Sequence, residues 1–258
     1  MPSRPINLLL GMLLTVVGVS RPSSAAELPL RFYLDSREGE QVQLRLTRDE
    51  ARDRRDFSSN YAPRDLGLAS AALAPPGPSP VSFALGAAAG RIDCSGTARV
   101  GHASGSCTFR PSPRFADLLQ RHGYASPSLD EGLTLTALRF DPEVLDALDA
   151  ACFPRGTTGE LAALAVFHID GREVRSLTAA GGRPEGLDKL VRMHVLGVTP
   201  GFIAGFTNAG YRNLPAEQLI QYKLFNITPE FVRTAESRAG RRLSTNEIVQ
   251  QRIQGPRR

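Results

Sequence analysis

The sequence predicts an α+β protein in which a small antiparallel β-domain precedes an α-helical repeat array of 29-residue helical hairpins. Three observations predict this fold: apolar residues alternate up to about residue 110, a short motif then returns every 29 residues, and an apolar stretch of signal-peptide type precedes both. The 258 residues are 41% hydrophobic, enough for one large or two small globular units. We therefore divide the chain into a signal peptide, a β-domain, a repeat array and a tail, at residues 1–26, 27–110, 111–249 and 250–258.

The first 26 residues have the composition of a bacterial signal peptide. Arg4 supplies positive charge, residues 6–19 form an uncharged Leu-rich run, and the small residues 24–26 mark a cleavage site before Glu27. The alternative is an uncleaved anchor, although the run is shorter than the about 20 residues that a spanning helix needs. No cysteine follows to carry a lipid, and no other segment is apolar enough to span. We expect a periplasmic or secreted protein with no membrane span after cleavage.

The β-domain is predicted because apolar residues recur at every second position, as in half-buried strands. Three runs show this alternation: Leu30-Phe32-Leu34, Val42-Leu44-Leu46 and Val81-Phe83-Leu85. We expect residues 36–40 to form a hairpin loop, and the stretch Arg48–Asp56 to form either a helical turn or a mobile loop. The proline-rich residues 75–78 interrupt regular structure. About five strands result, in a small antiparallel sheet or a sandwich.

Three cysteines are present, and export favours a disulfide between two of them. Cys94 and Cys107 lie symmetrically about a turn at residues 100–101, so we expect them to face each other across a hairpin and to be bonded. Cys152 is then the odd thiol, and we expect a small buried residue there. A nucleophilic role would need a positioned histidine, which the sequence does not indicate.

A motif of five residues starts at positions 111, 140, 169, 198 and 227, each 29 residues after the last. A second marker keeps the same step at Leu161, Leu190, Leu219 and Ile248. The pair Gly123-Tyr124 returns at Gly210-Tyr211, three steps later. Fixed spacing of independent markers without an insertion is the signature of a repeat architecture.

Each motif is predicted to start a helix, because a capping side chain precedes a proline at the first helical position. The pairs are Asp141-Pro142, Thr199-Pro200 and Thr228-Pro229, and we assign these residues a structural role. Gly210 and Gly240 suit the left-handed residue that ends such a helix.

The other segment of each unit is predicted to be a second helix. Apolar residues at 190, 191, 195 and 198, and at 219, 220, 224 and 227, fall on one broad face that we expect to be buried. A strand is the alternative, because residues 191, 193 and 195 also alternate. One such hairpin cannot bury its own apolar face, so neighbouring units must stack.

These segments support a resemblance to a known group. The stretches 109–124 (FRPSPRFADLLQRHGY), 190–211 and 219–240 resemble tandem units of bacterial exported proteins and of the extracytoplasmic C-terminal extensions of bla-regulator-like sensor-metallopeptidases. Residues 81–109 resemble the segment that precedes those repeats. The resemblance implies an architecture and a compartment but no activity. The unit at 169 departs from the pattern, with Gly171 for Pro and Glu173 for Phe, so we expect its helix to be frayed or rotated.

Composition and absent motifs narrow the function. The formal net charge is +5, and removing the signal peptide removes Arg4 and Arg21 and no acid, which leaves +3. That charge is too weak to indicate nucleic-acid binding. The sequence lacks a His-Glu-x-x-His zinc motif, a Ser-x-x-Lys motif, a Gly-x-Ser-x-Gly elbow and a phosphate-binding Gly loop. We therefore predict no cofactor, no metal ligand and no catalytic residue.

The histidines and carboxylates are given structural interpretations. His102 is expected in an exposed hairpin turn, and His122 near a helix C-terminus, where it favours capping. His168 and His194 occupy different positions in their units and form no metal ladder. The acid pairs at 141 and 143 and at 170 and 173 are explained by helix starts.

Two functions from different classes follow. The first is a non-catalytic interaction or scaffold protein whose repeat surface binds a protein or peptide partner in the cell envelope. The second is an exported hydrolase with a site between the β-domain and the first repeat, using His102, His122 or Asp130. A weaker third possibility is binding of an acidic polymer through the arginine-rich stretches 48–55 or 238–242.

Overall fold

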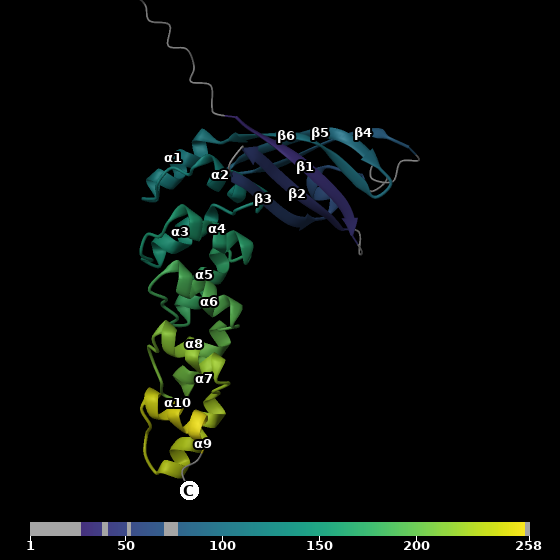
Figure 1. Cartoon of the computed structure of the whole chain (residues 1–258). Coiled ribbons are helices and arrows are strands. Elements are labelled where there is room, and N and C mark those ends of the chain that lie inside the picture. Colours follow the sequence, from purple (N-terminus) through teal and green to yellow (C-terminus); the bar gives the residue numbers. More distant parts are fainter. Residues whose placement is uncertain (1–26, 38–40, 51–52, 70–76, 256–258) are drawn as a thin grey trace, which may run out of the picture.

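The computed structural model describes residues 27–37, 41–50, 53–69 and 77–255. The predicted signal peptide, most of the loop 36–40 and the prolines at 75 and 76 lie outside these ranges. Within them the fold class is confirmed: a six-stranded antiparallel sheet is followed by ten α-helices. The helices stack into a rod that runs away from one end of the sheet (Figure 1).

The sheet is a single layer rather than a sandwich, with strand order β3-β2-β1-β6-β5-β4. Neighbouring strands are all antiparallel. One face carries the predicted alternating apolar residues and is buried, and the other face is polar. The strands are β1 Leu28–Arg37, β2 Gln41–Glu50, β3 Asp53–Tyr61, β4 Ser79–Ala87, β5 Gly90–Arg99 and β6 His102–Pro111.

The prediction for Arg48–Asp56 is wrong. This stretch is neither a helical turn nor a loop, because β2 and β3 pair along it, with Arg48 opposite Arg55 and Thr47 opposite Asp56. Backbone hydrogen bonds to the neighbouring strand stabilise this part of the hairpin, and they leave no apolar periodicity in the sequence. The sheet therefore has one strand more than the alternation indicates.

The predicted disulfide is present. Cys94 and Cys107 are directly opposite each other in the β5–β6 register, and their sulfur atoms are bonded. Both side chains point into the buried face of the sheet. Beside them Gly96 pairs with Gly105, and the ring of Phe32 covers Gly105 from β1. A side chain at either glycine would collide with the backbone of the partner strand, so these glycines allow β5 and β6 to approach.

The buried face of the sheet is closed by the first part of the array. Leu133 and Ala137 of α2 (Leu129–Ala137) belong to the same hydrophobic cluster as the strands. At the β3 edge, the hydroxyl of Tyr61 donates a hydrogen bond of 2.6 Å to the carbonyl of Ala137. The short 3-10 helix η1, Pro63–Leu66, follows β3 and contacts β4, the strand at the opposite edge. The sheet therefore curls around α2.

The array consists of paired helices at a constant step. Its even-numbered helices begin at residues 129, 158, 187, 216 and 245, each 29 residues after the last. We call the five pairs units 1 to 5. The segment 187–195 is a helix rather than a strand. The further helices are α1 Pro113–Arg121, α3 Glu143–Ala150, α4 Thr158–Val166, α5 Gly171–Ala179, α6 Leu187–Val195, α7 Pro200–Asn208, α8 Ala216–Leu224, α9 Pro229–Ala239 and α10 Thr245–Gln254.

The helices form two rows. Even-numbered helices contact even-numbered neighbours from α2 to α10, and α3, α5 and α7 contact each other in the second row. In Figure 1, α3 lies to the left of α4 while α9 lies to the right of α10, so the rows wind around each other. Helix α10 continues to Gln254 and includes the first residues of the predicted tail.

Helix starts in the odd row follow the capping logic. Thr199 and Thr228 hold the N-cap positions of α7 and α9, and their side chains accept hydrogen bonds of 3.2 Å from Phe202 N–H and Phe231 N–H. The carboxylate of Asp141 accepts a bond from Glu143 N–H at 3.0 Å. Helix α3 begins at Glu143, one residue later than the proline pattern indicates. Pro142 keeps helical dihedral angles, so the difference concerns only the boundary.

Helix ends follow the same step. A residue with positive φ follows the odd helices at Gly123, Cys152, Gly181 and Gly210, and Gly240 ends α9 one residue later in register. A second series follows the even helices at Arg139, His168, Gly197, Asn226 and Gly255. Left-handed backbone is costly for residues with a Cβ, which explains why glycine recurs in both series.

The expectation that the helix of unit 3 is frayed or rotated is wrong. Helix α5 is regular over nine residues, and the Asp170 carboxylate accepts a 2.8 Å hydrogen bond from Glu173 N–H. Gly171 is buried, and a Cβ on it would lie 3.0 Å from the carbonyl oxygen of Glu143. Glycine replaces proline here because α3 and α5 pack closely.

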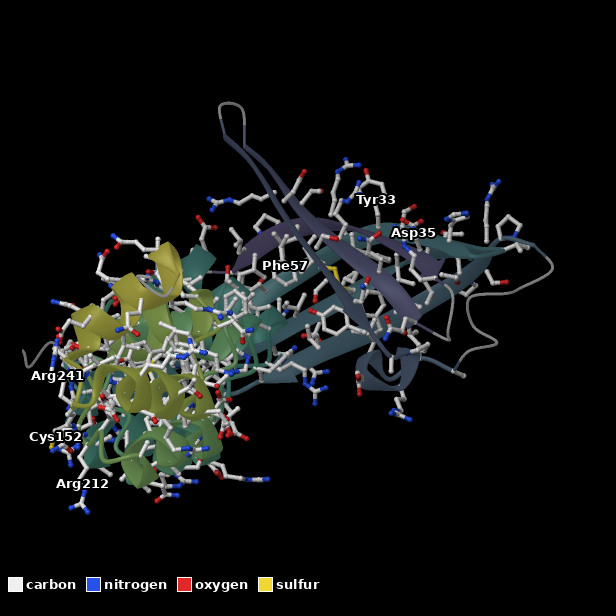
Figure 2. All side chains as sticks on the ribbon, turned by 90° about the horizontal axis from the view of Figure 1, so that it is seen from below. Tyr33, Asp35, Phe57, Cys152, Arg212 and Arg241 are labelled. Carbon is white, nitrogen blue, oxygen red and sulfur yellow. A yellow bond between two sulfur atoms is a disulfide. The ribbon has the colours of Figure 1, made fainter. Side chains whose placement is uncertain are left out.

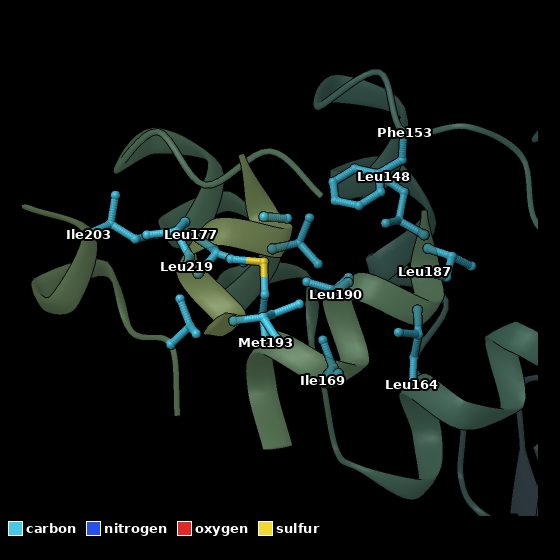
Figure 3. Close-up of a cluster of buried hydrophobic side chains, with 14 of the residues drawn as sticks. Leu148, Phe153, Leu164, Ile169, Leu177, Leu187, Leu190, Met193, Ile203 and Leu219 are labelled. Atoms are coloured by element: carbon cyan, nitrogen blue, oxygen red, sulfur yellow. The ribbon is translucent and has the colours of Figure 1, made fainter. Parts of the chain in front are cut away.

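One hydrophobic core runs the length of the array (Figure 3). Leu164, Met193 and Tyr222 fill the same position of successive even helices and are fully buried. In α10 this position is Gln251, which is half-buried. A polar residue on the outer face of the last unit is what a capping repeat requires.

Candidate binding surface

An exposed apolar stripe runs along the last turns of the even helices. Val166, Val195, Leu224 and Ile253 occupy one position in units 2 to 5 and are 50%, 57%, 58% and 55% exposed. Phe167 and Phe225 extend the stripe, each 39% exposed. Because successive even helices pack side by side, the stripe is continuous along the array. We define the stripe by these six residues.

The stripe corrects one sequence prediction. Residues 195 and 224 were expected on the buried face of their helices, together with 190 and 219. Leu190 and Leu219 are fully buried, but Val195 and Leu224 point to solvent. Helical periodicity places all of them on one broad face, and the packing of the neighbouring helix decides where that face ends.

A cationic or imidazole side chain precedes the stripe residue in units 3 to 5. The ammonium group of Lys223 lies 4.3 Å from the ring centre of Phe202, and the guanidinium of Arg252 lies 5.3 Å from that of Phe231. In unit 3 the corresponding contact is a 2.6 Å hydrogen bond between His194 Nδ1 and a carboxylate oxygen of Glu173. Glu173 therefore departs from the Phe pattern together with its partner on α6, which keeps an attractive contact at each step.

The opposite edge of the array, at the loops that lead into the even helices, is polar and basic. Arg155 lies over the ring of Tyr124, and Arg242 lies over the ring of Tyr211, at 5.9 and 4.4 Å. These contacts explain why the Gly-Tyr pair returns after three units. Cys152, Arg212 and Arg241 project on the same side of the array in Figure 2. Cys152 is exposed, so the expectation of a buried residue is wrong.

The two tyrosines belong to small networks with acids. The hydroxyl of Tyr211 donates to Glu236 and to the carbonyl of Leu243, at 2.5 and 2.8 Å. Burial, and then the hydrogen bond to Glu236, raise the pKa of Tyr211 well above its ordinary range. Burial disfavours ionisation of Glu236, but the hydrogen bonds from Tyr211 and from Leu243 N–H outweigh it and lower the pKa of that carboxyl. These networks join neighbouring units and have a structural role.

A shallow hollow of about 530 Å³ lies on the polar face of the sheet. Its lining includes Tyr33, Arg45, Ser104 and the pair Asp35–His102, in which His102 Nδ1 lies 2.7 Å from a carboxylate oxygen. Figure 2 shows Tyr33 and Asp35 on the sheet, away from the array. The His102 side chain is 73% exposed. A well-solvated imidazole without a hydroxyl bonded to it lacks the geometry of an activated nucleophile.

The three residues of the hydrolase hypothesis do not meet. His102 begins β6 and His122 follows α1, so the length of a ten-residue strand, about 30 Å, separates their backbones. The ring of His122 bonds to Asp149 at 2.7 Å in the next unit. Asp130 lies on α2 and pairs with Arg48 of the sheet at 2.9 Å. The His122 side chain does not bind the helix carbonyls, although the residue holds the C-cap position of α1.

Among the described residues, no group of three or more His, Cys, Asp or Glu side chains could hold a metal ion. Over the same ranges, no single helix is long and apolar enough to cross a membrane; α6 and α7 pass this test only as a pair bent by 88°.

No protein-family model matches this chain, and neither a curated protein nor a solved structure matches it. The resemblance to the extracytoplasmic repeats of bla-regulator-like proteins therefore stays a prediction based on the motifs quoted above.

Proposed function

We propose that this chain is a non-catalytic interaction protein that binds a protein partner of the bacterial cell envelope through the apolar stripe. The observation that carries the proposal is the stripe itself: one aliphatic residue, at least half exposed, at the same position of four successive helices. Exposed apolar surface in a continuous patch costs solubility and is typical of a binding surface. A repeat array offers such a surface over several units without needing a cleft.

Export from the cytoplasm is the second part of the proposal. The signal-type residues 1–26 support it. The disulfide between Cys94 and Cys107 also supports it, because such bonds persist in oxidising compartments. We expect mass spectrometry of the protein from a bacterial periplasmic fraction to find an N-terminus at Glu27. A protein that keeps residues 1–26 would favour the anchor instead.

The binding function is tested by capture of the partner with paired variants. Val195→Asp combined with Leu224→Asp places two charges on the stripe, at side chains that contribute little to the core. Val100→Asp is the matched control, because Val100 is 69% exposed in the β5–β6 turn, away from the array.

We expect cross-linking in intact cells, followed by purification, to recover the same envelope protein with the wild type and with Val100→Asp. Recovery should fall by about tenfold with the stripe variant, since a buried charge removes more than 1 kcal/mol of binding free energy. Circular dichroism should show all three proteins folded. Equal recovery from the stripe variant, or no reproducible partner, would show the proposal to be wrong.

A further inference from the structure

One position of the even helices changes its environment along the array. Ala137 on α2 is 1% exposed, whereas Val166, Val195 and Leu224, at steps of 29 residues, are at least half exposed. Ala137 is buried because the sheet curls around α2. The chain therefore shows, in unit 1, how the face that forms the stripe is covered when it is covered.

The cover in unit 1 includes a hydrogen bond to the helix end. Carbonyls in the last turn of a helix have no partner within the helix. The carbonyl of Ala137 is satisfied by the hydroxyl of Tyr61, on β3. The carbonyls of Val166, Val195 and Leu224 hold the same position, and no described residue donates a backbone or side-chain hydrogen bond to them. Each step of the stripe thus offers an apolar side chain beside a free acceptor.

The spacing of the stripe suits strands. Packed helices lie about 8–10 Å apart, and neighbouring strands about 4.8 Å apart. Every second strand of a sheet laid on the array can therefore meet one even helix. Sheets twist with a fixed hand, and the two helix rows also wind around each other (Figure 1), so a twisted sheet can follow the stripe over more than one unit.

We propose that the partner is a β-sheet surface of another protein. Its apolar side chains cover the stripe, and its hydroxyl-bearing side chains donate to the free carbonyls, as the chain's own sheet does on α2. This inference rests on the binding function proposed above. A second copy of this chain is a poor match, because the apolar face of its sheet is already buried and its outer face is charged at Arg31, Asp35, Arg45 and Arg99.

The test places a photoreactive amino acid at residue 195 or at residue 224 of the full chain, with residue 100 as the control position. After irradiation of intact bacteria, mass spectrometry identifies the partner residue that carries each adduct. We expect adducts from 195 and 224 in neighbouring strands of one partner protein, with at least about tenfold lower yield from residue 100. Adding Val166→Asp to the chain should reduce the yield further.

The possible outcomes separate the two proposals. Adducts in a helix, in an unstructured segment or in a second copy of this chain would overturn the β-sheet inference and leave a protein-binding stripe. The absence of an adduct at both positions, in a chain that is folded by circular dichroism, would overturn the binding function together with the inference.

Discussion

Cys152 is the residue at which the repeat pattern is least satisfied. It has φ of 54° at a position that glycine holds after α1, α5 and α7. Its exposed side chain makes no compensating contact in the core. Left-handed backbone costs a non-glycine residue about 1 kcal/mol, so this position carries a small local strain.

We predict that Cys152→Gly stabilises the protein by about 1 kcal/mol, because glycine adopts this conformation without a steric penalty. Urea unfolding followed by circular dichroism measures the change. Cys152→Ala is the control, since it also removes the thiol but keeps the Cβ, and it should leave the stability unchanged within error. Equal stabilisation by both variants would point to the thiol instead of the backbone.

A pH dependence is expected at Glu247. Hydrogen bonds from Arg241, and then from Ser244, lower the pKa of its carboxyl from 4.5 to about 2. Because the folded-state pKa lies below the unfolded value, the stabilisation is complete above about pH 4.5 and is lost as the pH falls toward 2.

Glu247→Gln should therefore melt slightly below the wild type at pH 7, within about 2 °C for an exposed pair, and at the same temperature at pH 2. Differential scanning calorimetry at the two pH values measures this. A melting difference that stays constant with pH would contradict an electrostatic origin.

At the scale of helices and strands, the capping residues make the most direct prediction. The Thr228 side chain accepts a hydrogen bond from Phe231 N–H at the start of α9. Thr228→Ala should destabilise the protein by about 1 kcal/mol, the usual effect of losing an N-cap. Thr234→Ala on the same helix is the control and should change the free energy of unfolding by less, since Thr234 bonds only to a helix carbonyl. Chemical denaturation measures both.

The same scale shows what the sequence could and could not predict. Thr-Pro and Asp-Pro pairs locate helix starts because capping is a local property of a few residues. Strand β3 escaped prediction because its pairing with β2 is non-local and leaves no alternation in a charged stretch. The exposure of Val195 and Leu224 could not be predicted from one helix, because neighbouring helices determine it. Aliphatic residues at 166, 195, 224 and 253 were the available signal.

At the scale of the whole molecule, the array is bounded at both ends. The sheet covers α2, and Gln251 in α10 replaces the large buried residues of earlier units. We predict that Gln251→Leu leaves the fold intact but causes self-association that increases with concentration, because it gives the end face an apolar centre. Sedimentation velocity measures this. Gln250→Leu is the control, on the exposed side of the same helix, and should stay monomeric.

The curl of the sheet around α2 has a consequence for the size of any complex. Five even helices share one design, but Ala137 is covered and only four steps face outward. The sheet thus acts as a stop that fixes where a bound partner can begin, and the last unit fixes where it ends. The footprint on the array is therefore set by the chain itself at four units, and a partner registers its position from the sheet.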